Sequence, residues 1–377
     1  MKQNYTSSLR RTLSAVLLLL LSTLAWAAPK SFFSDGILYT INEDEESVTL
    51  EGYYVDSCGV LVPSFYKAIS DVVVPSTLVH GGKTYRVTSI EACAFNDYTS
   101  LTSISLPKGL TSIRSYAFKG CSSLASISLP EGLTSIGNGV FSGCSSLASI
   151  SLPNGLTSIG SYAFKGCTSL ASISLPEGLT SIGEGAFYGC THLTSISLPD
   201  GLTSIGHNAF WECSSLASIS LTKGLTSIGA GAFYGCTALA SISLPDGLTS
   251  IGNSAFRKCS SLASISLPKG LTSIGGNTFS DCSSLASISL PKGLTSIGNN
   301  AFSDCSALGT VVCRAEDVPV VRERVFGASI WPATLSIWSA TLYVPASALE
   351  AYKAADQWKD FGSILPLDDT DTPSSSQ

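Results

Sequence analysis

Three residue types in this chain, histidine, serine and cysteine, have side chains that could bind a metal ion or attack a substrate. The 377 residues include three histidines, His80, His192 and His207. His192 and His207 fall in neighbouring copies of a repeated segment, but no cysteine or carboxylate cluster accompanies them at ligand spacing. A structural zinc ion is usually held by four ligands. We therefore expect these histidines to lie in exposed loops, and the sequence predicts no metal site.

Serine is abundant, but a catalytic serine needs a base and an orienting group within hydrogen-bond reach. The serines here instead form two rows with a spacing of 23 residues, from Ser103 and Ser105 to Ser287 and Ser289. The glycines that accompany them lack the lysine of a phosphate-binding loop. The sequence therefore predicts no catalytic residue, no cofactor and no enzymatic activity.

The chain has 12 cysteines, and nine of them share the same spacing. Side chains in register on adjacent turns point in parallel, whereas a disulfide needs a twisted torsion and Cβ atoms about 3.8 Å apart. We therefore expect buried free thiols; if oxidised, they would pair turn to turn and leave one over. Any disulfide is expected instead among the remaining three, Cys58, Cys93 and Cys313. The nine spaced cysteines are Cys121, Cys144, Cys167, Cys190, Cys213, Cys236, Cys259, Cys282 and Cys305.

These residues belong to a 23-residue unit that occurs nine times between Leu101 and Ala307. With Leu101 as position 1, it reads L-T/A-S-I-S-L-P-x-G-L-T-S-I-G-x-x-A-F-x-x-C-x-x. Apolar residues at positions 4 and 6 alternate with serine, which predicts a strand that ends at Pro-x-Gly. The A-F-x-x-C segment predicts one helical or 3₁₀ turn packed inward. No unit can bury its own apolar residues, so the units must stack as a solenoid.

The unit resembles the BspA-like (treponemal) leucine-rich repeat, whose pattern is L-x-x-I-x-L-P-x-x-L-x-x-I-G-x-x-A-F-x-x-C. The resemblance implies a leucine-rich repeat solenoid, with a parallel β-sheet on one face and short strands and 3₁₀ or helical turns on the other. For the family it implies exported bacterial proteins that take part in adhesion and protein binding. The structural alternative is a parallel β-helix, against which the Pro-x-Gly and A-F-x-x-C segments argue.

The regions that flank the repeats predict caps and processing signals. Lys2, an apolar run and Ala25 and Ala27 at small-x-small spacing are typical of a cleaved signal peptide. A degenerate repeat with Tyr98 in place of the cysteine precedes Leu101, and the repeat pattern continues to Cys313 before it is lost. The predicted regions are a signal peptide (1–27), a β-rich N-terminal cap with a degenerate repeat (28–100), nine repeats (101–307), a mixed α/β C-terminal cap (308–366) and a disordered tail (367–377). Ser347 is expected to cap an amphipathic helix that carries Leu349, Tyr352 and Trp358.

Charge and hydropathy restrict the partners and the location. The net charge is −6, and no basic stripe is available to neutralise phosphates, so nucleic acid is not an expected partner. No segment after the signal peptide has the length needed to cross a bilayer. We therefore expect a secreted or cell-surface protein.

The copies differ mainly at positions 8, 15, 16, 19 and 20, so any ligand specificity must reside there. Position 19 is Tyr188, Trp211 and Tyr234 in three consecutive repeats and Arg257 in the next. Interface hot spots favour these residue types, and we predict that the four residues bind a ligand. In the alternative, the rings only cover the neighbouring turn.

Together these features predict an exported, non-enzymatic scaffold that binds a macromolecule, in adhesion or protein interaction at a bacterial surface. The expected partner is a host or neighbouring-cell protein. Two alternatives remain: a carbohydrate-binding module that uses the serine rows and the aromatic residues, and a structural component of the cell envelope.

Overall fold

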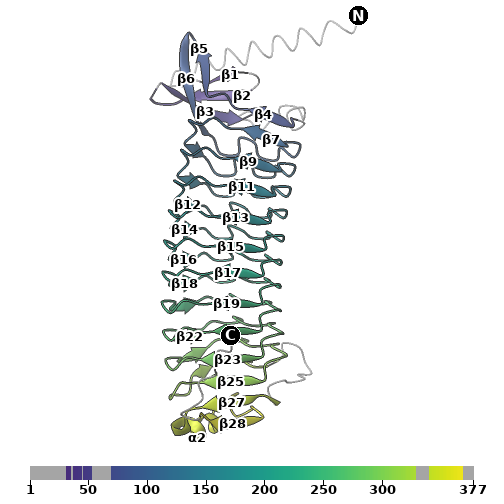
Figure 1. Ribbon diagram of the computed structural model, residues 1–377, viewed down its shortest axis with the longest axis vertical. Coiled ribbons are helices and arrows are strands. Elements are labelled where there is room, and N and C mark those ends of the chain that lie inside the picture. The colour runs from purple at the N-terminus through teal and green to yellow at the C-terminus, as the bar shows by residue number, and fades with distance from the viewer. Residues whose placement is uncertain (1–30, 35–36, 45, 53–68, 328–338, 368–377) are drawn as a thin grey trace, which may run out of the picture.

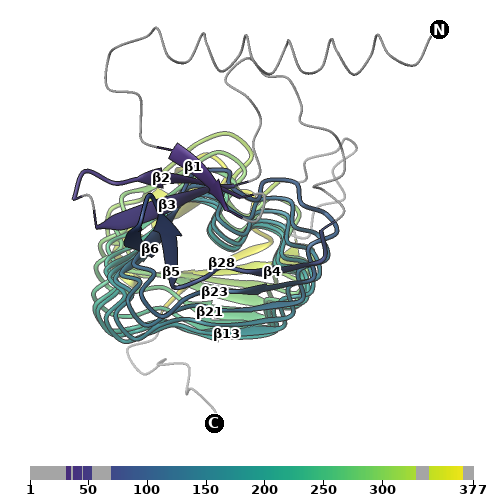
Figure 2. The same cartoon turned by 90° about the horizontal axis from the view of Figure 1, so that it is seen from above.

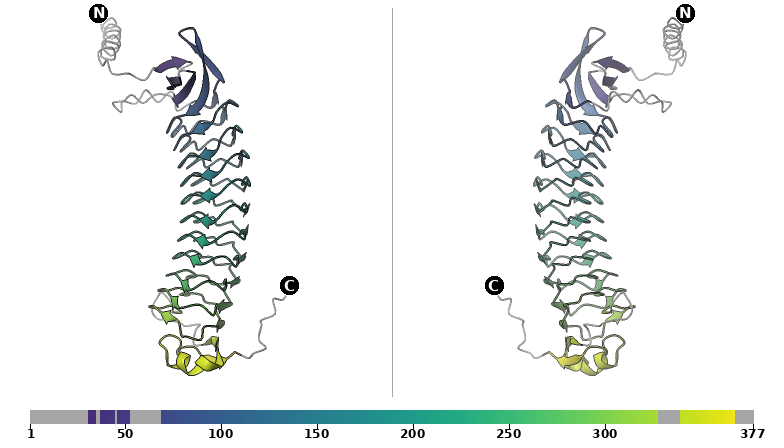
Figure 3. Two further views of the ribbon diagram at one scale, coloured as in Figure 1. Left: turned by 90° about the vertical axis from the view of Figure 1, so that its left-hand side faces the viewer. Right: turned by 90° about the vertical axis from the view of Figure 1, so that its right-hand side faces the viewer.

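The computed structural model describes residues 31–34, 37–44, 46–52, 69–327 and 339–367. The chain coils into a rod of stacked turns (Figure 1) that is gently bowed when viewed from the side (Figure 3). Seen from the end, successive turns lie over one another (Figure 2). The predicted signal peptide (1–27), Cys58 and all of the predicted tail except Leu367 lie outside the described residues. The rod is therefore the solenoid that the repeats predict.

The main sheet takes one short strand from each repeat. Where neighbouring strands hydrogen-bond, they pair in parallel and in register, so that Ile150 lies beside Ile127. From the first repeat to the eighth, the isoleucine of each strand is buried and both serines are exposed, which confirms the strand prediction. The strands are β7 (Ser103–Ser105), β9 (Ser126–Ser128), β11 (Ser149–Ser151), β13 (Ser172–Ser174), β15 (Ser195–Ser197), β17 (Ser218–Ser220), β19 (Ser241–Ser243), β21 (Ser264–Ser266) and β23 (Ser287–Leu290).

A second line of strands comes from the L-T-S-I-G segment of each repeat. Each strand has two residues, and the strands pair in parallel along the rod. Their isoleucines are buried against the same core as those of the main sheet. The strands are β8 (Ser112–Ile113), β10 (Ser135–Ile136), β12 (Ser158–Ile159), β14 (Ser181–Ile182), β16 (Ser204–Ile205), β18 (Ser227–Ile228), β20 (Ser250–Ile251), β22 (Ser273–Ile274) and β24 (Ser296–Ile297).

The A-F-x-x-C segment is not helical in the nine repeats, all of which lie within the described residues, so this detail of the prediction is wrong. Positions 16 and 20 have left-handed backbone, for example Tyr116 at φ 61° and Gly120 at φ 74°, and a right-handed helix cannot continue through such residues. The backbone N–H groups of Tyr116 and Phe118 donate instead to the carbonyls of Asn138 (2.8 Å) and Val140 (3.0 Å) in the next repeat. This side of the rod is therefore a stack of tight turns joined by backbone hydrogen bonds.

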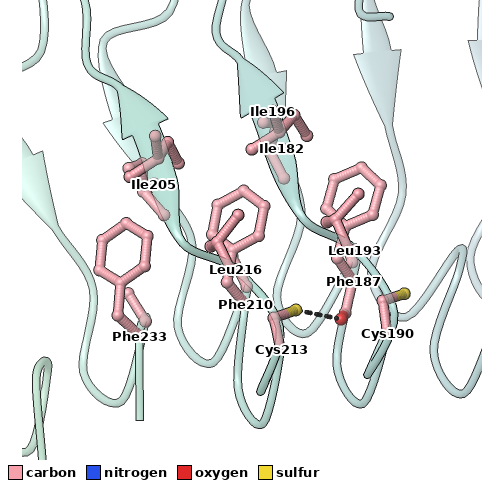
Figure 4. Close-up of a cluster of buried hydrophobic side chains, with 14 of the residues drawn as sticks. Ile182, Phe187, Cys190, Leu193, Ile196, Ile205, Phe210, Cys213, Leu216 and Phe233 are labelled. Carbon is pink, nitrogen blue, oxygen red and sulfur yellow. Dashed lines mark hydrogen bonds between the residues drawn. The ribbon is translucent and has the colours of Figure 1, made fainter. Parts of the chain in front are cut away.

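Phenylalanine at position 18 forms a continuous buried stack through the core. Rings of successive repeats are nearly parallel, with centroids 5.4 Å apart for Phe187 and Phe210 and for Phe210 and Phe233. Figure 4 shows these three rings beside the buried leucine and isoleucine side chains. The stack begins at Phe95 and ends at Phe326. It therefore links the degenerate first repeat to the turn beyond the ninth repeat.

The N-terminal cap is a β-sheet that continues into the second line of strands, with one separate strand that continues the main sheet. Its first three strands are antiparallel neighbours, its third lies parallel to β6, and β6 pairs with β8. A separate strand, β4, pairs with β7 and so begins the main sheet. The cap strands are β1 (Ser31–Ser34), β2 (Ile37–Ile41), β3 (Ser47–Gly52), β4 (Asp71–Val73), β5 (Thr77–His80) and β6 (Lys83–Ile90).

One further turn follows the ninth repeat, although the sequence pattern is lost after Cys313. Its strands β25 (Thr310–Cys313) and β26 (Val320–Val321) pair with β23 and β24, and Phe326 stacks on Phe302 at 5.6 Å. Phe326 follows Phe302 by 24 residues instead of 23, and valine replaces the usual isoleucine, which obscures the repeat. The solenoid therefore extends into the C-terminal cap.

The C-terminal cap closes the end of the core with a small amount of helix. It comprises β27 (Thr341–Val344), the 3₁₀ helix η3 (Ala346–Ala348), α2 (Leu349–Ala354) and β28 (Ser363–Pro366). The predicted capping role of Ser347 is wrong, because Ser347 lies inside η3 and α2 is capped by Ala348 without a side-chain hydrogen bond. Tyr352 is fully buried on α2, as predicted, but α2 ends at Ala354, so Trp358, which is also fully buried, lies beyond the helix that was expected to carry it.

Candidate functional site

The cysteines form a row of buried hydrogen-bond donors. All cysteines in the described residues are free, and Cys213 Sγ donates to the carbonyl oxygen of Phe187 at 3.1 Å (Figure 4). The other eight thiols of the row make the same contact with the preceding repeat. Burial raises the pKa of Cys190 to about 12, so the thiol keeps the proton that it donates. These cysteines are free thiols, as predicted, and they also bond one turn to the next.

Two of the cysteines outside this row are also free thiols. Cys93 is exposed, whereas Cys313 is buried with its sulfur 3.2 Å from the hydroxyl oxygen of Tyr352. They are therefore not joined to each other by a disulfide.

A thiol reagent should distinguish these cysteines in the native protein. In a Cys58→Ser background, Cys93 is expected to react quickly, because it is exposed. Raising a thiol pKa from 9.0 to about 12, as at Cys190, lowers the thiolate population about 1000-fold. The nine row cysteines should therefore react only on unfolding, as counted by mass spectrometry. Fast labelling of any of them in a Cys58→Ser, Cys93→Ser variant would contradict the buried thiol row.

The histidines contact the backbone of neighbouring turns. His192 Nδ1 lies 2.6 Å from the carbonyl oxygen of Thr168, and His207 Nδ1 accepts a hydrogen bond from the backbone N–H of Ala230 at 2.9 Å. Within the described ranges, no three histidine, cysteine or acidic side chains are grouped so that they could hold a metal ion. The structure thus gives both rings a role in joining turns.

The predicted aromatic residues do lie together. The ring centroids of Tyr188 and Trp211 are 5.9 Å apart with planes 5° from parallel, and those of Trp211 and Tyr234 are 3.7 Å apart with planes 6° from parallel. All three side chains are partly buried. The rings therefore form one short stack across three repeats and cover one another's faces.

Cations cover both ends of this stack. Lys165 Nζ lies 5.2 Å from the ring centroid of Tyr188. At the other end, the guanidinium of Arg257 and the Nζ of Lys258 lie 5.9 and 5.4 Å from the centroid of Tyr234. Such contacts are attractive because the ring face is electron-rich. Arg257, which we predicted as a site residue, is therefore part of the same surface as the three rings.

Two tyrosines that were not predicted as site residues belong to the same surface. Tyr162 lies beside Lys165, with 5.5 Å between ring centroid and Nζ, and Tyr116 lies beside Lys119 at 5.7 Å. Both tyrosines stand at position 16, where a glycine in the next repeat leaves room for the ring, as Gly139 does for Tyr116. The alternation of tyrosine and glycine at position 16 over the first four repeats was the available signal. We call the six aromatic and cationic side chains at position 19 the aromatic–cationic row: Lys119, Lys165, Tyr188, Trp211, Tyr234 and Arg257.

Three carboxylates border the row. The hydroxyl of Tyr162 donates to Glu184 at 2.5 Å, and this bond raises the tyrosine pKa. Arg257 pairs with Asp281 at 3.3 Å, with both side chains about one third exposed. Glu212 is exposed and forms no ion pair within the described part of the chain. Two of the three acids are therefore already engaged.

Comparison with protein families identifies the repeat. The model of the BspA type leucine rich repeat region matches residues 88–217 and 203–330, well over half of the chain. The chain belongs to the BspA-type leucine-rich repeat family. Proteins with leucine-rich repeats generally bind proteins and are generally not enzymes. No curated protein matched the sequence.

Solved structures include other leucine-rich repeat proteins. One from Bacteroides ovatus is 27% identical, and the match covers 89% of this BspA-type chain and 100% of the Bacteroides ovatus chain, with a TM-score of 0.51. A leucine rich cell surface protein from Faecalibacterium prausnitzii is 25% identical over 91% of this chain and 96% of its own, with a TM-score of 0.49. No helix among the described residues is long and apolar enough to cross a membrane.

Proposed function

We propose that this BspA-type protein is a non-enzymatic binding scaffold on the outside of a bacterial cell, and that it mediates adhesion to a host or neighbouring-cell protein. Leucine-rich repeat proteins generally bind proteins. Proteins of the BspA-type family are found at the bacterial cell surface, and the N-terminal sequence is typical of an exported chain. An antibody against the folded repeats should label intact cells, and labelling of lysed cells alone would refute this location.

The observation that carries the proposal is the aromatic–cationic row. The repeats are nearly identical in their buried positions, so a partner can distinguish one turn from another only at the variable positions. Tyr188, Trp211 and Tyr234 concentrate the residue types of interface hot spots within three adjacent turns. Because the rings are already stacked and partly buried, little side-chain entropy remains to be lost on binding.

Replacing Trp211 and Tyr234 with alanine is expected to weaken binding to the protein partner at least about 100-fold, as loss of hot-spot residues does. Matrix and cell-surface proteins immobilised on a sensor would first identify the partner and then measure the change in affinity. Tyr343→Ala is the matched control, because Tyr343 is a partly buried aromatic residue on β27, outside the row. Unchanged affinity in the double variant would remove the row from the interface.

The carbohydrate-binding alternative places the ligand on the serine rows. These hydroxyls lie on the outer face of the main sheet, and their regular spacing could suit a polysaccharide. A glycan array probed with the mature protein separates the two ideas. Binding that survives the loss of Trp211 and Tyr234 would favour the serine face.

A further inference from the structure

The cations of the aromatic–cationic row follow a period of two turns. Lys119 belongs to the first repeat, Lys165 to the third and Arg257 to the seventh. Neighbouring parallel strands are about 4.8 Å apart, so these cations are separated by about 10 and about 19 Å along the rod. Lys258 lies beside Arg257 against the same ring; because Asp281 is paired with Arg257, Lys258 keeps the seventh repeat positively charged. The row therefore offers positive charge at multiples of about 10 Å.

Between these cations the row offers hydrogen-bond donors. Trp211 has a ring on each side, Tyr188 lies between Trp211 and Lys165, and Tyr234 lies between Trp211 and the two cations of the seventh repeat. With both faces of each ring covered, the exposed part is the ring edge, which carries partial positive charge. The indole N–H and the two hydroxyls hydrogen-bond to no other described residue. The row therefore suits acceptor groups such as carbonyls, and offers no free ring face on which a sugar could stack.

An extended protein segment in the polyproline II conformation matches both features. It has three residues per turn and a rise of about 3.1 Å, so every third side chain recurs at about 9.3 Å on one face. Two turns of the solenoid cover nearly the same distance. The polyproline II backbone makes no internal hydrogen bonds, so its carbonyls are free to accept. A β-strand, with alternate side chains about 6.7 Å apart, would not keep this register.

We propose that the aromatic–cationic row binds a proline-rich protein segment in the polyproline II conformation, with acidic side chains, three residues or a multiple of three apart, that face the cations of the row. This rests on the proposed function, because it names the partner class of the same surface. The acidic side chains pair with Lys119, Lys165 and the cations at Tyr234, while backbone carbonyls accept from the ring edges of the central repeats.

Glu212 makes the proposal more specific. It occupies the fifth repeat, where the two-turn period would place another cation between Lys165 and Arg257. An acidic side chain of the ligand is repelled there, so the preferred segment has a neutral residue at that place. Replacing Glu212 by glutamine removes the repulsion and should improve binding of a uniformly acidic segment.

Synthetic peptides of equal length test this period directly. A repeating Pro-Pro-Glu peptide should bind, and Pro-Pro-Gln, Pro-Glu and Gly-Ser-Glu repeats should bind at least about tenfold more weakly in calorimetry at low salt. These controls remove, in turn, the charge, the three-residue period and the polyproline II conformation. Equal binding of the Gly-Ser-Glu repeat, or tighter binding of an uncharged or uronic acid polysaccharide, would overturn the proposal.

Three variants test the surface with the same peptide. Lys165→Gln is expected to weaken binding of the Pro-Pro-Glu repeat about tenfold, whereas Glu212→Gln should strengthen it about threefold. Lys269→Gln is the matched control, because Lys269 is exposed at position 8, away from the row, and should change nothing. Weaker binding in Glu212→Gln, or equal losses in both lysine variants, would contradict the assignment.

The peptide experiment and the adhesion experiment can fail separately. If the protein partner is lost in the Trp211 and Tyr234 variant but no Pro-Pro-Glu peptide binds, the proposed function stands and the polyproline II assignment is wrong. If that variant keeps its protein partner, the proposed function of the row fails, whatever the peptides do.

Discussion

Replacing Phe210 by alanine is expected to lower the free energy of unfolding by about 3–5 kcal/mol. The side chain is completely buried, and its ring packs between those of Phe187 and Phe233, each 5.4 Å away. Backbone hydrogen bonds between successive turns hold their spacing, so the neighbouring rings cannot move together to fill the cavity. Chemical denaturation followed by circular dichroism measures the loss.

A double-mutant cycle shows whether the ring stack itself contributes. Replacing Phe187 and Phe210 together should give a coupling free energy of about 0.5–3 kcal/mol, because the two rings are in contact. Phe118 and Phe210 are four repeats apart, and their losses should add to within about 0.5 kcal/mol. A loss below about 1 kcal/mol for Phe210→Ala, or equal coupling in both pairs, would show that the stack does not hold the turns together.

Much of the architecture could be predicted because each repeat faces the same neighbours. The alternation of serine and isoleucine placed Ile127 and Ile150 inside the main sheet and the serines outside, as observed. The parallel arrangement of successive cysteines argued correctly against disulfides along the row. When a 23-residue unit stacks on copies of itself, a position that is buried in one turn is buried in the next, so the pattern of one unit describes them all.

What could not be predicted depends on contacts between turns and on local backbone angles. The A-F-x-x-C segment has helical spacing. Positions 16 and 20 are glycine, asparagine or aspartate in many repeats, which favour a left-handed backbone, but they are tyrosine, serine, glutamate or lysine in others, which rarely adopt it. The sequence predicted the thiol of Cys213 only as a small apolar side chain. Its hydrogen bond to the Phe187 carbonyl depends on the distance between two turns, which the sequence does not give. The distances between the rings of the aromatic–cationic row are likewise set by the stacking of whole turns.

The reason for the glycine at position 14 is another feature that could not be predicted from the sequence, and stability measurements can test it. Positions 9 and 14 are both glycine in nearly every repeat, and the sequence suggests only a turn at each. In the structure, a Cβ on Gly252 would lie 2.4 Å from the backbone nitrogen of Ala230 in the preceding repeat. Gly252→Ala should therefore lower the free energy of unfolding by at least about 1–3 kcal/mol, since two hydrogen-bonded turns would have to separate.

Gly270→Ala is the matched control and should change stability in the opposite direction. A Cβ on Gly270, at position 9, would meet no atom within 4 Å, and its backbone is not left-handed. Alanine restricts the unfolded chain more than glycine does, which stabilises the folded state by about 0.4–1 kcal/mol. Urea denaturation of the two variants in parallel compares the same chemical change at two sites. An equal loss of stability in both variants would contradict the idea that close contact between turns requires glycine at position 14. A local turn at each site would then be the better explanation.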